Sequence, residues 1–304
     1  MAADRPALPA LDGAACTSGE RPVVVFAIDE AYAMPLATAM RSIVEANARA
    51  LPFDFRVLIE DISAATRDRV EKSLPTGAAS IRWVQIDLGA LGDIHPAEYA
   101  SGIINARLLI PRLVTDVARV LYLDADILVL GRLDSLWNED LRGAPVGAVL
   151  DGMDERLQAG DPSLAGLPRV RRYFNSGVML IDLEAWRDFE ITERAIDYLR
   201  RCPQARYPDQ DALNWALDGD WIELDPRWNC QAHLHNQDLV RMPPEKRPHI
   251  LHFVTAGKPW NAWVPNANAG VYDAMRAQTL FARGLRDRMR DLALGIGRRI
   301  KEQC

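Results

Sequence analysis

The sequence predicts an α/β protein with a doubly wound sheet, and two patterns in its first 90 residues support this prediction. Residues 23–29 form an apolar run that ends in an acid, which is typical of a strand buried on both faces of a parallel sheet. Two further strand patterns follow at 53–59 and 80–86, each after a helical pattern. This β-α-β-α-β alternation requires crossover connections, so we expect these strands to run parallel.

The two helices between these strands carry start signals. Pro35 is expected to begin the first helix, because proline suits the first helical position. The apolar residues of that helix share one face: Leu36, Met40, Ile43 and Val44. Ser63 is expected to cap the second helix, which should end near residue 74.

The rest of the chain continues the mixture of strands and helices. Strand patterns occur at 120–130, 146–150, 178–183 and 250–253, and helical patterns at 106–113, near 184, after 192 and at 209–217. Asp209 is expected to be the N-cap of the last of these helices. No linker rich in glycine, serine or proline divides these parts. We therefore expect one domain over 22–275, a disordered leader over 1–21 and a basic tail over 276–304.

Composition excludes several classes of protein. The net charge of −6 over 304 residues argues against nucleic acid as a partner, since such binders are basic. No run of about 18 uncharged apolar residues predicts a membrane span, and residues 1–22 lack the pattern of a signal peptide. The four scattered cysteines are expected to be free thiols in a reducing cytosol.

Asp124 and Asp126 interrupt the apolar run at 120–130. Two carboxylates there would be costly to bury unpaired, and on extended backbone a spacing of two points both the same way. They could therefore share one divalent cation, which can also hold the oxygens of a diphosphate. Solvated acids at a strand end would give the same pattern. So would a phosphatase of the haloacid dehalogenase type, although that class normally has threonine or valine at the position of Leu128 and places the motif on its first strand.

His252 and Lys258 favour the metal interpretation. His252 ends the last predicted strand, and Lys258 is one of only four lysines in the chain. Imidazole is a suitable third ligand for an ion such as Mn²⁺ beside two carboxylates. Lysine supplies a point charge for a phosphate. With the two aspartates, these residues predict a site for a divalent metal and a diphosphate.

Six segments occur in an order that resembles retaining glycosyltransferases of family 8: FAIDEAY (26–32), NARLLIPRL (105–113), LYLDADILV (121–129), YFNSGVMLIDLEAW (173–186), YPDQDALN (207–214) and HFVTAGKPW (252–260). The likeness covers about 25–265, and the family includes bacterial lipopolysaccharide galactosyl- and glucosyltransferases and glycogenin. It implies a GT-A fold with a Rossmann-like, doubly wound mixed sheet. It also implies transfer of a hexose from a UDP-sugar, UDP-glucose or UDP-galactose, with retention of anomeric configuration and Mn²⁺ as the usual cofactor (Mg²⁺ being the alternative).

The resemblance also implies roles for particular residues. Donor-binding residues would be Ala27 and Asp29 at the uridine, Arg107 near the sugar or diphosphate, Asp124 near the ribose, Asn175, Asp209 and Gln210 at the sugar, and Lys258 at the diphosphate. Metal ligands would be Asp124, Asp126 and His252. Two departures from the family pattern concern contacts near the donor: Ala31 stands where a polar residue is common, and Thr255 replaces a glycine that here comes later, as Gly257.

The same resemblance frames the catalytic step. A double displacement would need a carboxylate beneath the sugar ring, but the family offers a glutamine, here Gln210, which is a poor nucleophile. We therefore favour front-face substitution, in which the departing phosphate helps to deprotonate the acceptor hydroxyl. Asp209 or Asp211 is the alternative, as a nucleophile, and Lys258 is expected to stabilise the leaving diphosphate.

The acceptor is expected to be a saccharide, and lipopolysaccharide core fits the bacterial members of the family. From 281 onward apolar residues recur at helical spacing among basic ones, which predicts a peripheral helix at the cytoplasmic face of the inner membrane, or a helix packed on the domain or on a second copy. Trp228, Trp260 and Trp263 could stack on an acceptor sugar or belong to the core. A soluble or protein acceptor, and an inactive protein that binds sugar nucleotides, remain alternatives.

Overall fold

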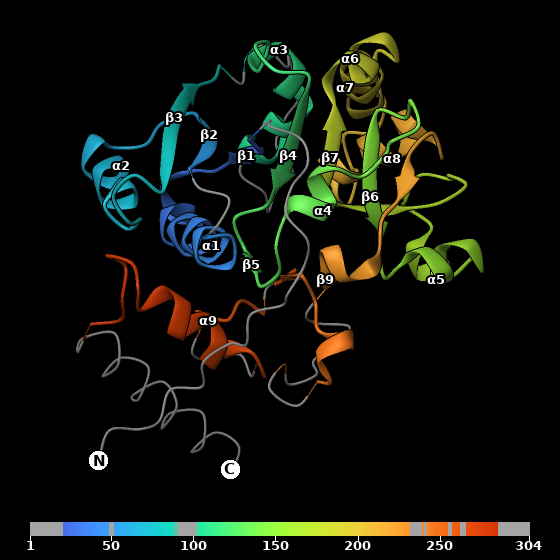
Figure 1. The fold of residues 1–304 in the computed structure, drawn as a ribbon. Helices are drawn as coiled ribbons and strands as arrows, with labels where there is room; N and C mark the ends of the chain where they lie inside the picture. The colour runs from blue at the N-terminus through green and yellow to red at the C-terminus, as the bar shows by residue number, and fades with distance from the viewer. Residues whose placement is uncertain are drawn as a thin grey trace, which may run out of the picture.

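The computed structural model describes residues 21–48, 52–87, 89, 102–231, 239, 242–254, 257–261 and 266–284. Its strands are β1 (Val23–Ala27), β2 (Phe53–Ile59), β3 (Ala79–Gln85), β4 (Arg119–Leu123), β5 (Ile127–Val129), β6 (Val146–Leu150), β7 (Phe174–Asp182), β8 (Ile222–Glu223), β9 (Cys230–Gln231) and β10 (Ile250–His252). Within the described residues they form a seven-stranded sheet of order β3-β2-β1-β4-β7-β6-β8 and a three-stranded sheet of order β5-β10-β9 (Figure 1).

The first part of the large sheet confirms the predicted β-α-β-α-β pattern. The strands β1, β2 and β3 run parallel, and α1 (Ala33–Ala46) and α2 (Ala64–Glu71) connect them. Ser63 caps α2 as predicted, because its hydroxyl accepts a hydrogen bond from the Thr66 amide at 3.2 Å. The helix α1 begins two residues before Pro35, after the 3-10 turn η1 (Glu30–Tyr32).

The second part of the large sheet is mixed, as the resemblance implied. β4 runs parallel to β1 and antiparallel to β7, and β7 also pairs antiparallel with β6. β7 begins four residues earlier than predicted, so Asn175 lies inside this strand and not before it. Most residues of β7 are buried because it is a central strand, with β4 on one side and β6 on the other.

The predicted strand over 120–130 is wrong as a continuous element. The chain leaves the large sheet after Leu123, bends at residues 124–126, and enters the small sheet as β5. There β5 pairs antiparallel with β10, with Ile127 opposite His252. The two acids therefore lie in a bend between two sheets. The Asp124 amide donates to the Gly177 carbonyl of β7, and the Asp126 carbonyl accepts the Phe253 amide directly after β10.

The remaining helices include the four that were predicted, with two corrections, and others that were not predicted. They are α3 (Ile110–Leu113), α4 (Asp134–Trp137), α5 (Asp154–Gln158), α6 (Leu183–Asp188), α7 (Ile191–Arg201), α8 (Pro208–Leu217) and α9 (Ala269–Arg276), with 3-10 turns η3 (Gly102–Leu109), η4 (Pro162–Leu164), η5 (Pro226–Asn229) and η7 (Pro244–Lys246). The helices α4, α5 and α9 were not predicted. The first half of the helical stretch at 106–113 belongs to the 3-10 turn η3 and the second half is α3. Asp209 is not the N-cap of α8, because Pro208 takes the first helical position and Tyr207 the cap.

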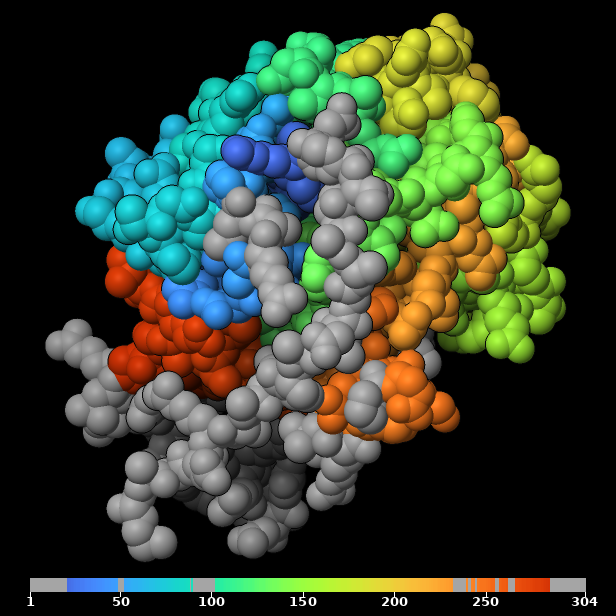
Figure 2. Space-filling model, viewed as in Figure 1, coloured from blue at the N-terminus to red at the C-terminus, as the bar shows by residue number. Residues whose placement is uncertain are grey.

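The C-terminal part of the described chain packs back on the beginning of the domain. The helix α9 contacts α1, and the two lie next to each other in Figures 1 and 2. Arg69 of α2 donates to the Leu280 carbonyl at 2.8 Å and stacks over the ring of Phe281. Phe281 lies in a turn and is buried, so the helical stripe predicted from this residue does not include it. Residues 285–304 lie outside the described residues, as do residues 1–20 of the predicted leader over 1–21.

Two further predictions have an outcome here. No helix in the described ranges has the length and apolar character needed to cross a bilayer. Cys202 and Cys230 are free thiols, whereas Cys16 and Cys304 lie outside the described residues.

Candidate active site

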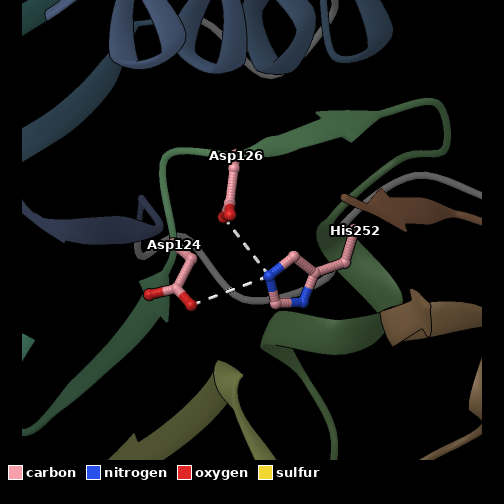
Figure 3. Close-up of side chains that lie close together, drawn as sticks. All are labelled: Asp124, Asp126 and His252. Carbon is pink, nitrogen blue, oxygen red and sulfur yellow. Dashed lines mark ion pairs between the residues drawn. The ribbon is translucent and has the colours of Figure 1, made fainter. Parts of the chain in front are cut away.

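Asp124, Asp126 and His252 converge where β4, β5 and β10 end or begin (Figure 3). The imidazole Nε2 lies 3.3 Å from Asp126 Oδ1 and 3.7 Å from Asp124 Oδ2. One donor atom from each residue lies within 4.8 Å of the others, and the two carboxylates and the imidazole are buried or nearly so. Two carboxylate oxygens and one imidazole nitrogen form a donor set that suits a divalent cation.

The other oxygen of Asp124 is held in place by buried donors. Asp124 Oδ1 accepts hydrogen bonds from the Tyr122 hydroxyl at 2.8 Å and from Arg107 Nη2 at 2.9 Å. Burial raises the pKa of Tyr122, so this hydroxyl stays protonated and remains a donor. Because Oδ1 is occupied, only Oδ2 of Asp124 is directed at His252. Such outer partners fix the orientation of a metal-binding carboxylate.

Lys258 lies beside Asp126. Its ammonium group contacts Asp126 Oδ2 and donates to the Phe253 carbonyl at 2.7 Å. Burial alone would raise the pKa of Asp126, but the charges of Lys258 and His252 outweigh it and hold that pKa well below its ordinary range. Asp126 is therefore an anion throughout the physiological range of pH, as a metal ligand must be.

Gly177 permits the close approach of β7 to this cluster. A Cβ atom at this position would lie 2.2 Å from His252 Cε1 and 2.6 Å from Asp124 Oδ2. The Gly177 carbonyl also accepts the Asp124 amide at 2.8 Å, which ties the bend to β7. Glycine is thus required here for space.

Arg107 joins the cluster to α8. Its guanidinium also pairs with Asp209 at 3.0 Å and donates to Ser176 Oγ at 2.8 Å, and its side chain is 6% exposed. Burial alone would lower the pKa of Arg107, but Asp124 and Asp209 more than compensate and raise it. Arg107 is therefore a buried residue of the site and does not lie on a helix surface.

Gln210 and Asn175 meet at a carboxylate that the sequence analysis did not single out. Asp151, directly after β6, accepts from Asn175 Nδ2 at 3.0 Å and from Gln210 Nε2 at 3.2 Å. Gln210 Oε1 accepts the Ser176 amide at 3.1 Å. All three side chains are buried within the same group of polar residues as Arg107.

Asp211 is oriented away from this group. Its carboxylate contacts the Tyr173 hydroxyl and accepts the Tyr207 amide at 3.0 Å, and the residue has no exposed surface. Burial raises the pKa of Asp211 to about 6. These contacts give Asp211 a structural position and argue against the predicted alternative in which it is a nucleophile.

The two residues predicted at the uridine lie at the carboxyl end of β1. Ala27 ends the strand and is partly exposed, and Asp29 accepts the Tyr32 amide at 3.2 Å as the cap of η1. Burial first, then the charges of Asp126, Asp124 and Asp29, raise the pKa of Tyr32. Tyr32 is therefore close enough to both Asp29 and the acidic pair to be affected by their charges, which its own sequence context did not indicate.

The three tryptophans for which stacking on an acceptor or a place in the core was predicted lie in different environments. Trp228 is buried and stacked on His249, with ring centroids 4.4 Å apart, so it belongs to the core. Trp260 is half-buried and meets Tyr32 edge to face at 6.2 Å, near the cluster. Trp263 lies outside the described residues.

Sequence reasoning missed several site residues, among them Tyr122, Asp151 and Asn229, whose amide oxygen lies 2.9 Å from His252 Nδ1. Asp151 directly follows an apolar strand pattern, as Asp29 nearly does, so its position at a strand end could have been noticed. Asn229 had no such signal, because its partners belong to distant segments. Tyr122 lies only two positions before its partner Asp124, but it stands in an apolar run as an ordinary strand residue.

The fold and this site together define the class of the protein. The galactosyltransferase LgtC, solved in complex with donor and acceptor sugar analogs, superposes with a TM-score of 0.73 at 26% identity, over 84% of this chain and 96% of that chain. The glycosyltransferase GlyE of Streptococcus pneumoniae gives a TM-score of 0.64 at 26% identity, over 84% of this chain and 60% of that chain. The protein is thus a glycosyltransferase with a GT-A fold.

The family follows from the sequence comparisons. The model of glycosyl transferase family 8 matches residues 23–264, and the chain belongs to this family. General stress protein A of Bacillus subtilis is 30% identical over 79% of this chain and 87% of its own length. The lipopolysaccharide 1,2-glucosyltransferase of Escherichia coli is 27% identical over 79% of this chain and 73% of its own length. The predicted family and fold are confirmed.

Proposed function

We propose that the protein transfers glucose or galactose from a UDP-sugar to a saccharide acceptor, with retention of anomeric configuration and with Mn²⁺ as cofactor. The observation that carries this proposal is the convergence of Asp124, Asp126 and His252 beside Lys258. This arrangement combines three ligands for a divalent cation with an ammonium group suited to a diphosphate. Mg²⁺ is the alternative ion, because two of the three ligands are oxygens.

The residues around the cluster have complementary tasks in this proposal. The bound cation would neutralise the diphosphate and stabilise the negative charge that develops on it as the sugar–phosphate bond breaks. Lys258 adds a second positive charge on the same side. Ala27 and Asp29 bind the uridine, and Arg107 holds Asp124 and Asp209 near the donor. Asn175, Asp209 and Gln210 line the sugar.

The contacts of the buried carboxylates support front-face substitution. Asp209 is ion-paired with Arg107, and Asp211 is fully buried against Tyr173. Gln210 turns its amide oxygen to the Ser176 amide. We therefore propose that the acceptor oxygen bonds to the anomeric carbon on the face from which the diphosphate departs. The hydroxyl proton then passes to the departing phosphate oxygen.

The acceptor that we propose is lipopolysaccharide core, at the cytoplasmic face of the membrane. Relatives named as lipopolysaccharide glucosyl- and galactosyltransferases support this, with 27% identity in the examples from Escherichia coli and Salmonella typhimurium. The basic, periodic sequence after residue 284 supports a membrane surface as the place of action.

The direct test is release of UDP from UDP-glucose and UDP-galactose, measured separately with Mn²⁺, with Mg²⁺ and with EDTA. We expect release from one donor only, dependent on the metal, and loss of release in Asp126→Asn with an unchanged circular dichroism spectrum. Asp68→Asn, an exposed acid on α2, is the control and should behave as wild type. The proposal would be refuted if the protein neither released UDP from a UDP-sugar nor bound a UDP-sugar.

A further inference from the structure

A chain of buried hydrogen bonds runs from β6 across β7 to the imidazole of His252. Asp151 Oδ2 accepts from Asn175 Nδ2 at 3.0 Å, and Asn175 Oδ1 accepts from Asn229 Nδ2 at 2.8 Å. Asn229 Oδ1 then lies 2.9 Å from His252 Nδ1. All four residues are more than nine-tenths buried, so water does not offer alternative partners to these groups.

The direction of each hydrogen bond in this chain is determined. The Asp151 carboxylate can only accept, so Asn175 must present its NH₂ group to it. The Gly177 amide donates to Asn175 Oδ1 at 3.1 Å, which fixes the same orientation from a second side. Asn229 must then donate to Asn175 and direct its own oxygen at His252. If the Asn175 amide were reversed, its oxygen would face the Asp151 carboxylate and its NH₂ group would face the Gly177 amide. If the Asn229 amide were reversed, its oxygen would face Asn175 Oδ1. Neither amide can therefore rotate.

This direction dictates where the imidazole carries its proton. Nδ1 of His252 lies 2.9 Å from the acceptor Asn229 Oδ1, so it must be protonated. An unprotonated Nδ1 would direct its lone pair at a lone pair of that oxygen. When the ring is neutral, the lone pair is therefore on Nε2. That atom is the one directed at Asp124 Oδ2 and Asp126 Oδ1. A metal ligand requires this tautomer.

We propose that Asn229 is a positioning residue for the metal site: it holds the proton of His252 on Nδ1 and so keeps Nε2 available as a ligand. The proposal rests on the proposed function, in which His252 binds the metal. Without the Asn229 acceptor, the tautomer with its proton on Nε2 is favourable, because Nε2 could donate to the carboxylate of Asp124 or Asp126. The imidazole would then present a hydrogen, and not a lone pair, to the cation.

The turn that carries Asn229 is fixed to the strand that carries His252. β9 follows η5 directly and pairs with β10, with Gln231 opposite His252. Trp228 stacks on His249 at the start of β10, and the His249 amide donates to the Arg227 carbonyl at 2.8 Å. Both ends of the Asn229–His252 hydrogen bond therefore move as one unit, as positioning of a ligand requires.

The experiment compares three variants of the full chain. Asn229→Leu has nearly the same volume but no acceptor for Nδ1. Asn229→Asp keeps an acceptor for Nδ1, but it replaces the donor to Asn175 with a second oxygen and adds a negative charge. Gln231→Leu is the matched control. It also replaces a buried amide with leucine, but the Gln231 oxygen accepts from the Gly152 amide and not from His252. The readouts are Mn²⁺ binding without donor, by electron paramagnetic resonance, and the ¹⁵N spectrum of labelled histidine without metal at alkaline pH.

We expect Nδ1 of His252 to be protonated in wild type, in Asn229→Asp and in Gln231→Leu, and the proton to shift to Nε2 in Asn229→Leu. Mn²⁺ affinity should fall about 10- to 100-fold in Asn229→Leu and only a few-fold in the other two. A wild-type ring protonated on Nε2, or unchanged Mn²⁺ affinity in Asn229→Leu, would overturn the proposal. Absence of Mn²⁺ binding in the wild type would refute the metal site itself, whereas the ¹⁵N spectra would still decide the tautomer.

Discussion

Asp211 is the residue at which burial and charge conflict most directly, since its carboxyl has no exposed surface and a pKa of about 6. A carboxyl whose pKa is raised above that of the unfolded chain binds its proton more tightly when folded. Its contribution to the free energy of unfolding is therefore fully present below pH 4 or so, and is lost as the pH rises to about 6. The shift corresponds to roughly 3 kcal/mol.

We therefore expect Asp211→Asn to remove this pH dependence. As the pH rises from about 4 to 6, the wild type should lose unfolding free energy at this position while the variant does not. Urea titrations at each pH measure this difference in unfolding free energy. Tyr173→Phe is a useful companion variant, because the Tyr173 hydroxyl lowers the pKa of Asp211. Its loss should move the transition to higher pH. A difference that stays constant over this range would contradict the prediction.

Gly177 offers a second test at the residue scale. Gly177→Ala would place a methyl group 2.2 Å from His252 Cε1 and 2.6 Å from Asp124 Oδ2, so the ligands must separate. We expect loss of Mn²⁺ binding and destabilisation of about 1–3 kcal/mol, measured by calorimetry and urea unfolding. Gly270→Ala is the control, because a Cβ there meets nothing within 4 Å. Wild-type metal affinity in Gly177→Ala would show that the ligands can be displaced without loss of binding.

Which residues of the site could be predicted depends on the kind of signal they carry. Asp124, Asp126 and Lys258 are conspicuous because acids in an apolar run and a rare lysine are unusual in themselves. Asn229 is an ordinary polar residue, and its significance comes from an imidazole 23 positions away and an amide 54 positions away. Roles that arise from buried contacts between distant segments leave no local pattern to read.

At the scale of elements, the same reasoning explains why the strand over 120–130 was predicted as continuous. β4 and β5 are both apolar and buried, and only the three residues Asp124–Asp126 separate them, so their patterns resemble one strand with two acids in it. What separates them is pairing with different partners, β7 and β10, and pairing is a property of the tertiary structure. By contrast, β1 to β3 were correctly predicted to run parallel, because the helices between them make crossover connections.

The C-terminal segment allows a prediction about elements. Residues 278–281 contact α1 and α2 through Arg41, Ser73 and Arg69, so they belong to the folded domain. Truncation after Gly284 should preserve UDP-sugar hydrolysis and thermal stability but abolish binding to anionic lipid vesicles. Truncation after Arg276 should in addition lower the melting temperature, because the contact of Arg69 with Phe281 is lost. Vesicle binding that survives the cut after 284 would place the membrane contact elsewhere.

At the scale of the whole molecule, the site lies where the two sheets meet. The large sheet supplies Asp124 at the end of β4 and Asn175 and Gly177 in β7, while the small sheet supplies His252 at the end of β10. A ligand that connects Asp124 with His252 therefore connects the two sheets. Its binding energy should add to the stability of the entire domain, because binding only to the folded state shifts unfolding by mass action.

We accordingly expect Mn²⁺ and UDP together to raise the melting temperature by several degrees, since ligand at about a hundred times Kd contributes roughly 2.7 kcal/mol. UDP with EDTA should give little of this shift, because Lys258 alone would then face the diphosphate. Asp124→Asn should lose the shift while Asp68→Asn keeps it, as measured by differential scanning calorimetry. An equal shift with UDP in the presence of EDTA would mean that the nucleotide is bound without the cation, and that the acidic pair and His252 serve another purpose.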